Sequence, residues 1–359
     1  MAMRISEAAD AAFQELVVQH ESQYLSIPCL MGGVGIGKTE TAADLCARME
    51  SVVQDSLLCS VIATGEAGDP TDIAGVPWVV NERVQWLLNS AARRACETPV
   101  LLVFDDIDKA TPIVINGLLK LFIERSFKDF RLHPKSLMMC AGNRVADDIH
   151  ANALSESIRT RITIIEVETH IEDFVGWATR NGEQKIHPLL IGWLLTHPEY
   201  LHKPMEGVMR FSTPRGLREL SLHMFRYPDP KGWKATAERK IGSPAGNDFW
   251  VWYTILRKID VDYILEHGEL KEPVTATDKM PAAVAEKMGE FAAVFAVVDR
   301  LNQKLKSNHA GLEKFIDSLS PELRVAFLLQ MKEPTKREFV KHYKKAAGQI
   351  MGGIIKDGS

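Results

Sequence analysis

The sequence predicts an α/β fold, a doubly wound parallel five-stranded sheet, followed by a region built only from helices. A glycine-rich loop joins a short apolar strand to a helix near the N-terminus. Further apolar, β-branched runs alternate with helical patterns, as in doubly wound sheets, whereas only helical patterns follow residue 168. The expected strands are 26–31, 57–64, 100–104, 137–141 and 162–167.

Length and composition indicate a globular chain of several domains. The chain has 359 residues, 46% apolar and 25% charged, with a net charge of −4. That charge provides no overall attraction to nucleic acid or anionic membranes. No apolar run reaches the roughly 18 residues that a membrane span needs. The start of the chain lacks a secretory signal, and the five cysteines lack metal-site spacing, so we expect reduced thiols and a cytoplasmic location.

Helices are expected between the strands. Residues 6–20 have an amphipathic pattern, and residues 40–53 follow the glycine-rich loop as a helix. Residues 65–78 are dense in turn formers and predict an inserted loop, with a helix over 81–96 after it. Thr111-Pro112 predicts the N-cap and first turn of another helix.

The later part of the chain predicts helices separated by loops. Pro214 is expected to open a helix with Arg215 in its first turn. Residues 227–246 predict a loop rich in Pro, Gly and Lys, and residues 269–281 a linker. Residues 332–345 carry six basic residues against two acidic ones. A solvated helical face is the favoured interpretation, and a partner surface is the alternative.

The glycine-rich loop carries the clearest chemistry. Residues 32–39 satisfy G-x-x-x-x-G-K-[ST], between a strand and a helix as this phosphate-binding motif requires. Backbone amides and the helix N-terminus would hold phosphates, Lys38 would reach the β- and γ-phosphates, and Thr39 would ligate Mg²⁺. The candidate nucleotide-binding residues are Gly32, Gly33, Val34, Gly35, Ile36, Gly37, Lys38, Thr39 and Glu40.

A pair of carboxylates ends the strand at 100–104. Asp105 and Asp106 follow it directly, at the end of a parallel strand where α/β sheets place ligand chemistry. A single acidic residue there could simply end the strand. For a pair at this distance after a phosphate loop that explanation is poor, and the pair favours ligand chemistry.

Several of these stretches together resemble the MoxR-like branch of the AAA+ ATPases, which includes the NorQ and CbbQ types. The resemblance runs from about Ser26 to Leu220. Residues 32–39 correspond to Walker A and residues 101–110 to Walker B, and residues 69–77 resemble the branch's helix-2 insert. Residues 140–145 are similar to its sensor 1 segment.

The resemblance implies roles for further residues. Asn143 would be the sensor 1 residue, Arg161 the arginine finger and Arg215 the sensor 2 residue. The implied strand order puts the fourth strand between the first and third, which would bring Asn143 between Lys38 and Asp105. Asp105 would then hold Mg²⁺, Asp106 and Asn143 would act on the attacking water, and the arginines would neutralise the γ-phosphoryl group.

One position departs from that family. Members usually have Glu where this chain has Asp106, and the shorter side chain predicts slower hydrolysis. Asp108 is the next candidate for the base if Asp106 does not act on the water.

The resemblance also implies an AAA+ P-loop fold and an assembly. The expected domains are the nucleotide-binding domain at 1–168, a helical lid at 169–268 and a helical C-terminal region at 269–359. The cofactors would be ATP or ADP with Mg²⁺. A homo-oligomer, most simply a hexameric ring, would remodel a protein partner of the von Willebrand factor A type.

Three other functions stay open. A DNA-directed motor or loader would bind nucleic acid in a salt-sensitive way, and the acidic net charge argues weakly against it. A nucleotide-gated scaffold with little turnover is made credible by Asp106. A small-molecule kinase ranks last, because it has no need of Asn143 or the two arginines.

Overall fold

The structure is a computed structural model, and it describes part of the chain. The described residues are 2–22, 27–147, 151–178, 185–205, 208–271, 293–294, 296–298, 300–302, 309–319, 323–324, 327, 331, 333–343 and 347. The chain forms two compact units, Met1–Asp173 and Phe174–Ser359, which are described separately. The finer division at residues 168 and 268 stays a prediction.

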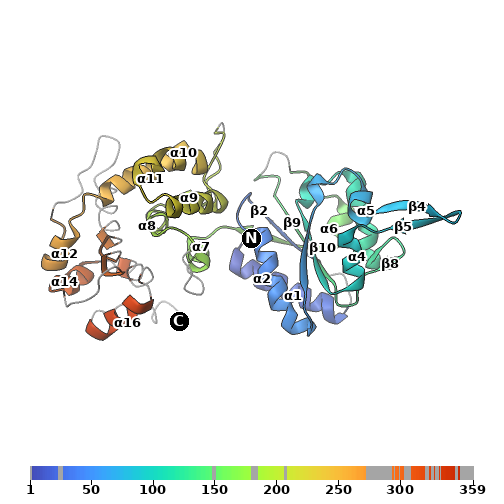
Figure 1. Ribbon diagram of the computed structural model, residues 1–359, viewed down its shortest axis with the longest axis horizontal. Helices are drawn as coiled ribbons and strands as arrows, with labels where there is room; N and C mark the ends of the chain where they lie inside the picture. The colour runs from blue at the N-terminus through green and yellow to red at the C-terminus, as the bar shows by residue number, and fades with distance from the viewer. Residues whose placement is uncertain are drawn as a thin grey trace. The chain divides into compact units, whose positions relative to one another are not determined.

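The first unit is built on a parallel sheet, so the predicted α/β class is confirmed (Figure 1). The sheet has six strands and not five. In spatial order they are β1 (Met3–Arg4), β10 (Ile162–Glu168), β2 (Ile27–Gly32), β9 (Leu137–Gly142), β6 (Val100–Asp105) and β3 (Leu58–Ala63). The strand order expected from the family resemblance is also confirmed, because β9 lies between β2 and β6.

The additional strand lies at the edge. Met3 of β1 pairs with Val167 of β10 in a parallel ladder. Two residues are too few to produce an alternating pattern, so the sequence gave no signal for this strand. Ser26, the first residue of one expected strand, lies outside the described residues.

Helices cover both faces of the sheet. On one face α1 (Ile5–Ser22) and α2 (Lys38–Val53) pack against Leu101 and Val103 of β6. The side chains between these point to the other face and pack against the helices there. Those helices are α3 (Pro70–Ala74), α4 (Ser90–Glu97), α5 (Pro112–Glu124) and α6 (Glu156–Arg159). Coverage of both faces explains why the central strands β2, β9 and β6 are apolar and buried almost throughout.

Helix α1 is also bonded to a central strand. The side chain of Gln19 is fully buried. Its Oε1 atom accepts from the Met138 amide at 2.7 Å, and its Nε2 atom donates to the Met138 carbonyl at 3.0 Å. The ladder between β2 and β9 pairs residues from Cys29–Cys140 onward. The Gln19 side chain therefore bonds both the amide and the carbonyl of Met138, which precedes the part of β9 that pairs with β2.

The predicted helix over 81–96 is wrong in its first half. Strands β4 (Val76–Val80) and β5 (Arg83–Leu87) form an antiparallel hairpin, and α4 begins only at Ser90. Asn81 and Glu82 both have positive φ, 50° and 62°, as a tight two-residue turn between strands requires. The β-branched and aromatic residues on either side favour strands.

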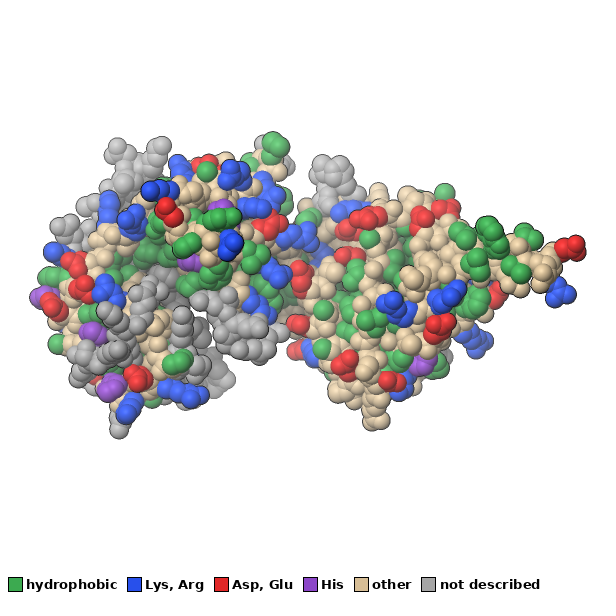
Figure 2. Space-filling model, viewed as in Figure 1, with side chains coloured by type: hydrophobic (Ala, Val, Ile, Leu, Met, Phe, Trp, Pro, Cys, Tyr) green, Lys and Arg blue, Asp and Glu red, His purple; other side chains and the backbone are tan. Residues whose placement is uncertain are grey.

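The hairpin carries exposed apolar side chains (Figure 2). Val79 and Val84, which face each other across the strands, are each 67% exposed, and Trp78 is 60% exposed. The stretch expected as an irregular loop also contains a short 3-10 turn, η1 (Thr64–Glu66), and α3.

The predicted N-cap and first turn at Thr111-Pro112 are confirmed. Thr111 caps α5 by accepting from the Val114 amide at 3.4 Å, and Pro112 occupies the first turn. The short turn-rich segment after α5 is a small hairpin of β7 (Ser126–Phe127) and β8 (Phe130–Arg131). The 3-10 turn η2 (Ile107–Lys109) follows β6 and shapes the end of that strand.

The described part of the second unit consists of helices and loops with one isolated β-bridge, between Lys203 and Ser212. Its helices are α7 (Ile171–Ala178), which crosses the boundary between the units, α8 (Pro188–Thr196), α9 (Pro214–Arg226), α10 (Trp233–Ile241), α11 (Ser243–Leu256), α12 (Val261–His267), α14 (Leu312–Ser318) and α16 (Glu333–His342), with 3-10 turns η4 (Pro198–Leu201) and η5 (Pro230–Gly232). Helix α9 begins at Pro214 as predicted.

The predicted loop at 227–246 is wrong. It contains η5, all of α10 and the start of α11. Trp233, Ala237 and Ile241 are buried at four-residue spacing, so the apolar face of α10 outweighs the Pro and Gly around it. Most of the expected linker, residues 272–281, lies outside the described residues.

Helix α16 packs through its apolar face, where Phe339 is fully buried. Arg337 and Lys341 are exposed on the other side, while Lys332, Lys344 and Lys345 lie outside the described residues. Among the helices that the structure describes, none has the length and apolar character needed to cross a membrane.

Candidate nucleotide-binding site

The glycine-rich loop connects β2 to α2 at the carboxyl end of the sheet. Gly35 and Gly37 have φ of 74° and 100°, which glycine adopts without strain. Gly32 is needed for a different reason, since a Cβ there would lie 2.4 Å from the Val167 carbonyl oxygen. The loop leads into the N-terminus of α2, where the first backbone amides have no partner inside the helix and would stabilise an anion.

Lys38 lies buried beneath that loop, with only 8% of its surface exposed. Its Nζ atom donates to the carbonyl oxygens of Gly32 at 2.9 Å and Gly33 at 2.7 Å, and to Asn143 Oδ1 at 3.0 Å. Burial lowers the pKa of Lys38 to about 8, and the nearby aspartates, Asp105 first, offset part of this effect. A desolvated ammonium group of this kind attracts phosphate strongly.

Thr39 and Asp105 form a pair of oxygen ligands. The Thr39 hydroxyl donates to Asp105 Oδ2 at 2.9 Å, and the other carboxylate oxygen accepts from the Asp106 amide at 3.0 Å. Hydroxyl and carboxylate oxygens beside a phosphate site fit Mg²⁺, which is usually held by one or two protein groups plus phosphates and water. The described residues contain no cluster of three or more His, Cys, Asp or Glu side chains suited to a metal.

Asp106 begins the turn after β6 in a left-handed conformation, with φ of 51°. Its Oδ1 atom lies 3.2 Å from Lys109 Nζ and 3.4 Å from Asn143 Nδ2. The side chain is 46% exposed, so water can reach it. A partly solvated carboxylate next to a buried amide is suited to orienting a water molecule.

Asn143 follows β9 and is 4% exposed. Because β9 lies between β2 and β6, its side chain reaches both Lys38 and Asp106. The alternative base, Asp108, is 1% exposed, and its Oδ1 atom accepts from the Asn143 amide at 2.8 Å. Asp108 therefore faces the interior and is poorly placed to contact a water molecule.

The structure does not bring Arg161 into this cluster. Arg161 precedes β10 at the amino end of the sheet, where Ile162 pairs with Ile27. At about 3.3 Å per residue, that end is roughly 17 Å along the sheet from Gly32. The Arg161 side chain donates to Ser157 O, and to Thr160 Oγ1 at 3.1 Å. Arg215 is exposed on the first turn of α9, in the second unit.

The remaining candidates differ in how they could contact a nucleotide. Glu40 is exposed in the first turn of α2. The side chain of Ile36 is buried in the core beneath the loop, so that only its backbone could take part. The roles of all these residues stay predictions.

Sequence reasoning missed two residues at this edge of the sheet. Thr64 is fully buried after β3, and its hydroxyl donates to the Asp105 carbonyl oxygen. Lys109 pairs with Asp106 across one helical turn. The three-residue spacing of Asp106 and Lys109 was a usable signal, because residues three apart meet in helical turns. Thr64 carried no signal, since its contact depends on the pairing of β3 with β6.

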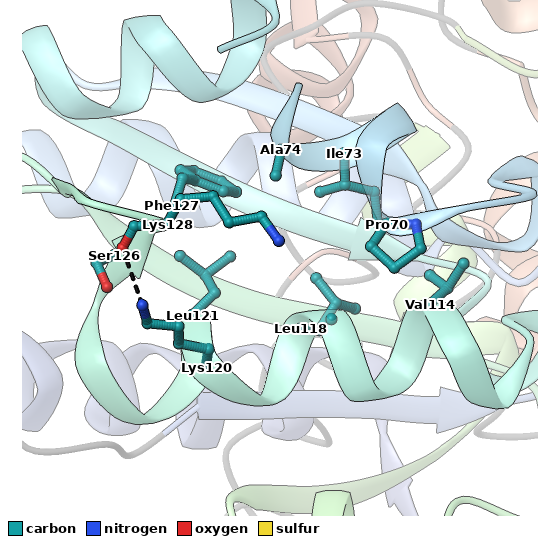
Figure 3. Close-up of a pocket in the computed structure, with 11 residues that line it drawn as sticks. Pro70, Ile73, Ala74, Val114, Leu118, Lys120, Leu121, Ser126, Phe127 and Lys128 are labelled. Atoms are coloured by element: carbon teal, nitrogen blue, oxygen red, sulfur yellow. Dashed lines mark hydrogen bonds between the residues drawn. The ribbon is translucent and has the colours of Figure 1, made fainter. Parts of the chain in front are cut away.

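A separate groove lies between α3, α5 and β7 (Figure 3). Its lining is mainly apolar, with Lys120 and Lys128 at the margin, and the Lys120 ammonium donates to the Lys128 carbonyl oxygen at 3.1 Å. The lining residues are Pro70, Ile73, Ala74, Val114, Gly117, Leu118, Lys120, Leu121, Ser126, Phe127 and Lys128. The groove shares no residue with the phosphate loop and lacks the converging polar groups of a nucleotide site.

Comparison with known proteins agrees with this geometry. Residues 28–161 match the family model described as an AAA domain of the dynein-related subfamily. No curated protein matches the chain.

Solved structures give distant likenesses. The RuvB Holliday-junction branch-migration motor of Thermotoga maritima is 11% identical with a TM-score of 0.32, covering 93% of this chain and 87% of that one. The Aeropyrum pernix ORC1 protein in complex with DNA is 13% identical with a TM-score of 0.41, covering 74% and 71%. Structural similarity at these scores does not indicate the activity of this chain.

Proposed function

We propose that this chain, whose residues 28–161 match an AAA-domain family model, is an AAA+ ATPase that hydrolyses ATP with Mg²⁺ and uses the energy to remodel a protein partner. The observation that carries the proposal is the convergence of Lys38, Asn143 and Asp106 at the end of the sheet. Each of these side chains comes from a different segment of the chain, and together they supply the cation, the amide and the carboxylate that phosphoryl transfer needs.

The chemistry follows from the placement of these groups. The loop amides and Lys38 would bind the β- and γ-phosphates. Mg²⁺ held by Thr39 and Asp105 would neutralise charge on the phosphate oxygens when bound. Asp106 and Asn143 would orient a water molecule that attacks the γ-phosphorus. The bond to the β–γ bridging oxygen then breaks, ADP leaves, and the water proton passes to Asp106 or to the released phosphate.

We assign the chain to the MoxR-like branch on its Walker B and sensor motifs. A homo-oligomeric ring, hexameric by that resemblance, is supported by the distance of Arg161 from the site of its own chain. A finger that serves a neighbouring subunit must lie away from its own nucleotide. A von Willebrand factor A-type protein is the partner that the same resemblance suggests.

One observation favours a second function, a nucleotide-gated scaffold. The Asp106 carboxylate is paired with Lys109, and Asp is one methylene shorter than the Glu usual in the family. Both features would slow hydrolysis and prolong the ATP-bound state. A DNA-directed motor is less favoured, because the net charge of −4 provides no overall attraction to nucleic acid.

The decisive experiment measures ATP binding and steady-state turnover of the full chain with Mg²⁺. Lys38→Ala should abolish measurable ATP binding, because the lysine supplies the main point charge for the phosphates. Lys135→Ala, which removes a partly exposed lysine paired with Asp55, is the matched control and should leave binding unchanged. Unchanged affinity in Lys38→Ala would contradict the site, whereas tight binding without turnover would favour the scaffold.

A further inference from the structure

We propose that Asp108 is a positioning residue that fixes the orientation of the Asn143 side-chain amide, so that its oxygen faces Lys38 and its nitrogen faces Asp106. The expected effect on turnover rests on the proposed ATPase function. The orientation of the Asn143 amide rests only on contacts within this chain. The sequence by itself indicates Asp108 only as a substitute base.

The first step is the contact between Asp108 and Asn143. Asp108 Oδ1 accepts from the Asn143 backbone amide at 2.8 Å, and Oδ2 lies 3.5 Å from Asn143 Nδ2. Asp108 is 1% exposed, so water does not compete for these oxygens. An ionised carboxylate offers only acceptors, and it therefore favours the NH₂ end of the amide on its side.

The second step concerns the other end of the same amide. Lys38 Nζ has only donors to offer and lies 3.0 Å from Asn143 Oδ1. The opposite rotamer would point the NH₂ group at the ammonium and the oxygen at two carboxylates, those of Asp106 and Asp108. The charges on both sides therefore select one orientation, which is the usual basis for assigning such amides.

The third step is steric. Gly142 immediately precedes Asn143, and a Cβ at Gly142 would lie 2.7 Å from Asp108 Oδ1. The absence of a side chain is what lets the carboxylate reach the backbone of β9. Burial raises the pKa of Asp108, and the hydrogen bond from the Asn143 amide acts in the opposite direction. The hydrogen bond between the Asp108 carboxylate and the Asn143 amide therefore depends on the glycine at position 142.

The functional consequence is a link between phosphate binding and water activation. Asn143 Nδ2 lies 3.4 Å from Asp106 Oδ1 while the amide oxygen is bonded to Lys38. A rotated amide would lose both contacts together. Because misplacement by about 1 Å can cost roughly 10²-fold in rate, we expect Asp108 to affect turnover more than nucleotide affinity.

The kinetic test is a double-mutant cycle measured by single-turnover hydrolysis, which detects slow reactions. Asp108→Asn keeps the side-chain volume but offers an NH₂ group where Asn143 needs an acceptor. It should lower kcat about 10- to 100-fold with ATP affinity within roughly threefold of wild type. In the Asn143→Ala background the same change should have almost no further effect. Asp147→Asn, a matched control at a carboxylate that pairs with Arg144 and has no hydrogen bond to Asn143 among the described contacts, should keep wild-type kinetics.

The structural test needs no hydrolysis. Asn143→Asp places a carboxylate against Asp108 and should lower the unfolding midpoint, and adding Asp108→Asn should restore several degrees of that loss. If the wild-type chain proves to hydrolyse no ATP, the proposed function fails and this unfolding cycle alone decides the positioning. Independent unfolding effects at the two positions, or an equal kinetic cost of Asp108→Asn with and without Asn143, would overturn the proposal.

Discussion

Lys38 Nζ and Asn143 Oδ1 lie 3.0 Å apart, although the two residues are separated by 105 positions in the sequence. One comes from the first turn of α2 and the other directly follows β9. Their contact exists because β2 and β9 are neighbours in a parallel sheet, whose carboxyl ends meet at one edge. It joins the phosphate-binding loop to the groups expected to act on water.

The first prediction concerns Asp106. Asp106→Asn should keep ATP affinity near wild type and lower turnover by about 10²–10⁴-fold, the range for loss of a general base. Asp106→Glu should speed hydrolysis, because the added methylene extends the carboxylate toward the water. Equilibrium nucleotide binding and steady-state phosphate release measure the two effects. Normal turnover in Asp106→Asn would place the base elsewhere, and the buried Asp108 is a poor replacement for it.

The second prediction concerns Arg161. If it serves a neighbouring subunit, Arg161→Ala should bind ATP almost normally but lose a finger contribution of roughly 10³–10⁵ in rate. Mixing it with Lys38→Ala protein should recover part of the activity, because those subunits donate intact fingers to sites that still bind ATP.

Arg159→Ala is the control for that experiment. Arg159 is exposed two residues earlier on α6, and its removal should cost no more than a surface charge, about 0–1 kcal/mol in stability. Full activity from dilute monomer, or no recovery in assembled mixtures, would refute a shared site.

The third prediction concerns acid stability of the second unit. His187 caps α8, with Nδ1 accepting from the Leu189 amide at 3.3 Å, and its ring packs against Phe225 and Trp233. Burial lowers the pKa of His187 from 6.5 to about 4. Below pH 6.5 the unfolded chain therefore binds a proton that the folded chain excludes. Stability should be complete above pH 6.5 and fall as the pH drops toward 4.

The size of this effect at pH 5 is about 2 kcal/mol by linkage. His187→Asn keeps a capping acceptor and removes the titration, so it should flatten the pH dependence. Denaturant unfolding at pH 7.5 and pH 5 measures the difference. His197, a second histidine of this unit, provides the comparison through His197→Asn. An equal loss of stability in wild type and His187→Asn would assign the acid sensitivity to other groups.

The fourth prediction is that α16 does not bind nucleic acid. Its apolar side is packed in the core through Phe339, and its exposed basic side chains keep that face solvated. A gel shift at near-physiological salt should show no complex with single- or double-stranded DNA. A complex that disappears when Lys336 and Lys341 become Gln would instead support the DNA-directed alternative.

The centre of the sheet was predictable because its central strands are buried on both faces. Val100 to Phe104 are apolar without interruption and fully buried, which is the pattern that the sequence showed. The hairpin was missed because its turn is Asn81-Glu82, without the glycine that usually marks such turns. Its alternating polar residues, such as Arg83 and Gln85, also fit an exposed helix.

The candidate site was predictable only as far as its motifs reach. The phosphate loop and the paired aspartates follow each other in recognisable order, so their residues could be named. The partners of Asn143 could not be named from the sequence, because they depend on the register of β9 against β2 and β6. The burial of Asp108 has the same origin, since no local pattern distinguishes it from the partly exposed Asp106.

The bond between Gln19 and Met138 determines where this half of the chain can be cut. The matched AAA segment begins at residue 28, after α1 has ended. A fragment starting there would expose the core face that α1 covers and leave the Met138 amide and carbonyl without the partners that Gln19 supplies. Buried groups of this kind cost about 1–3 kcal/mol each when left unsatisfied. The cooperative folding unit therefore begins upstream of the recognisable motifs, and the N-terminal helix is an integral part of it.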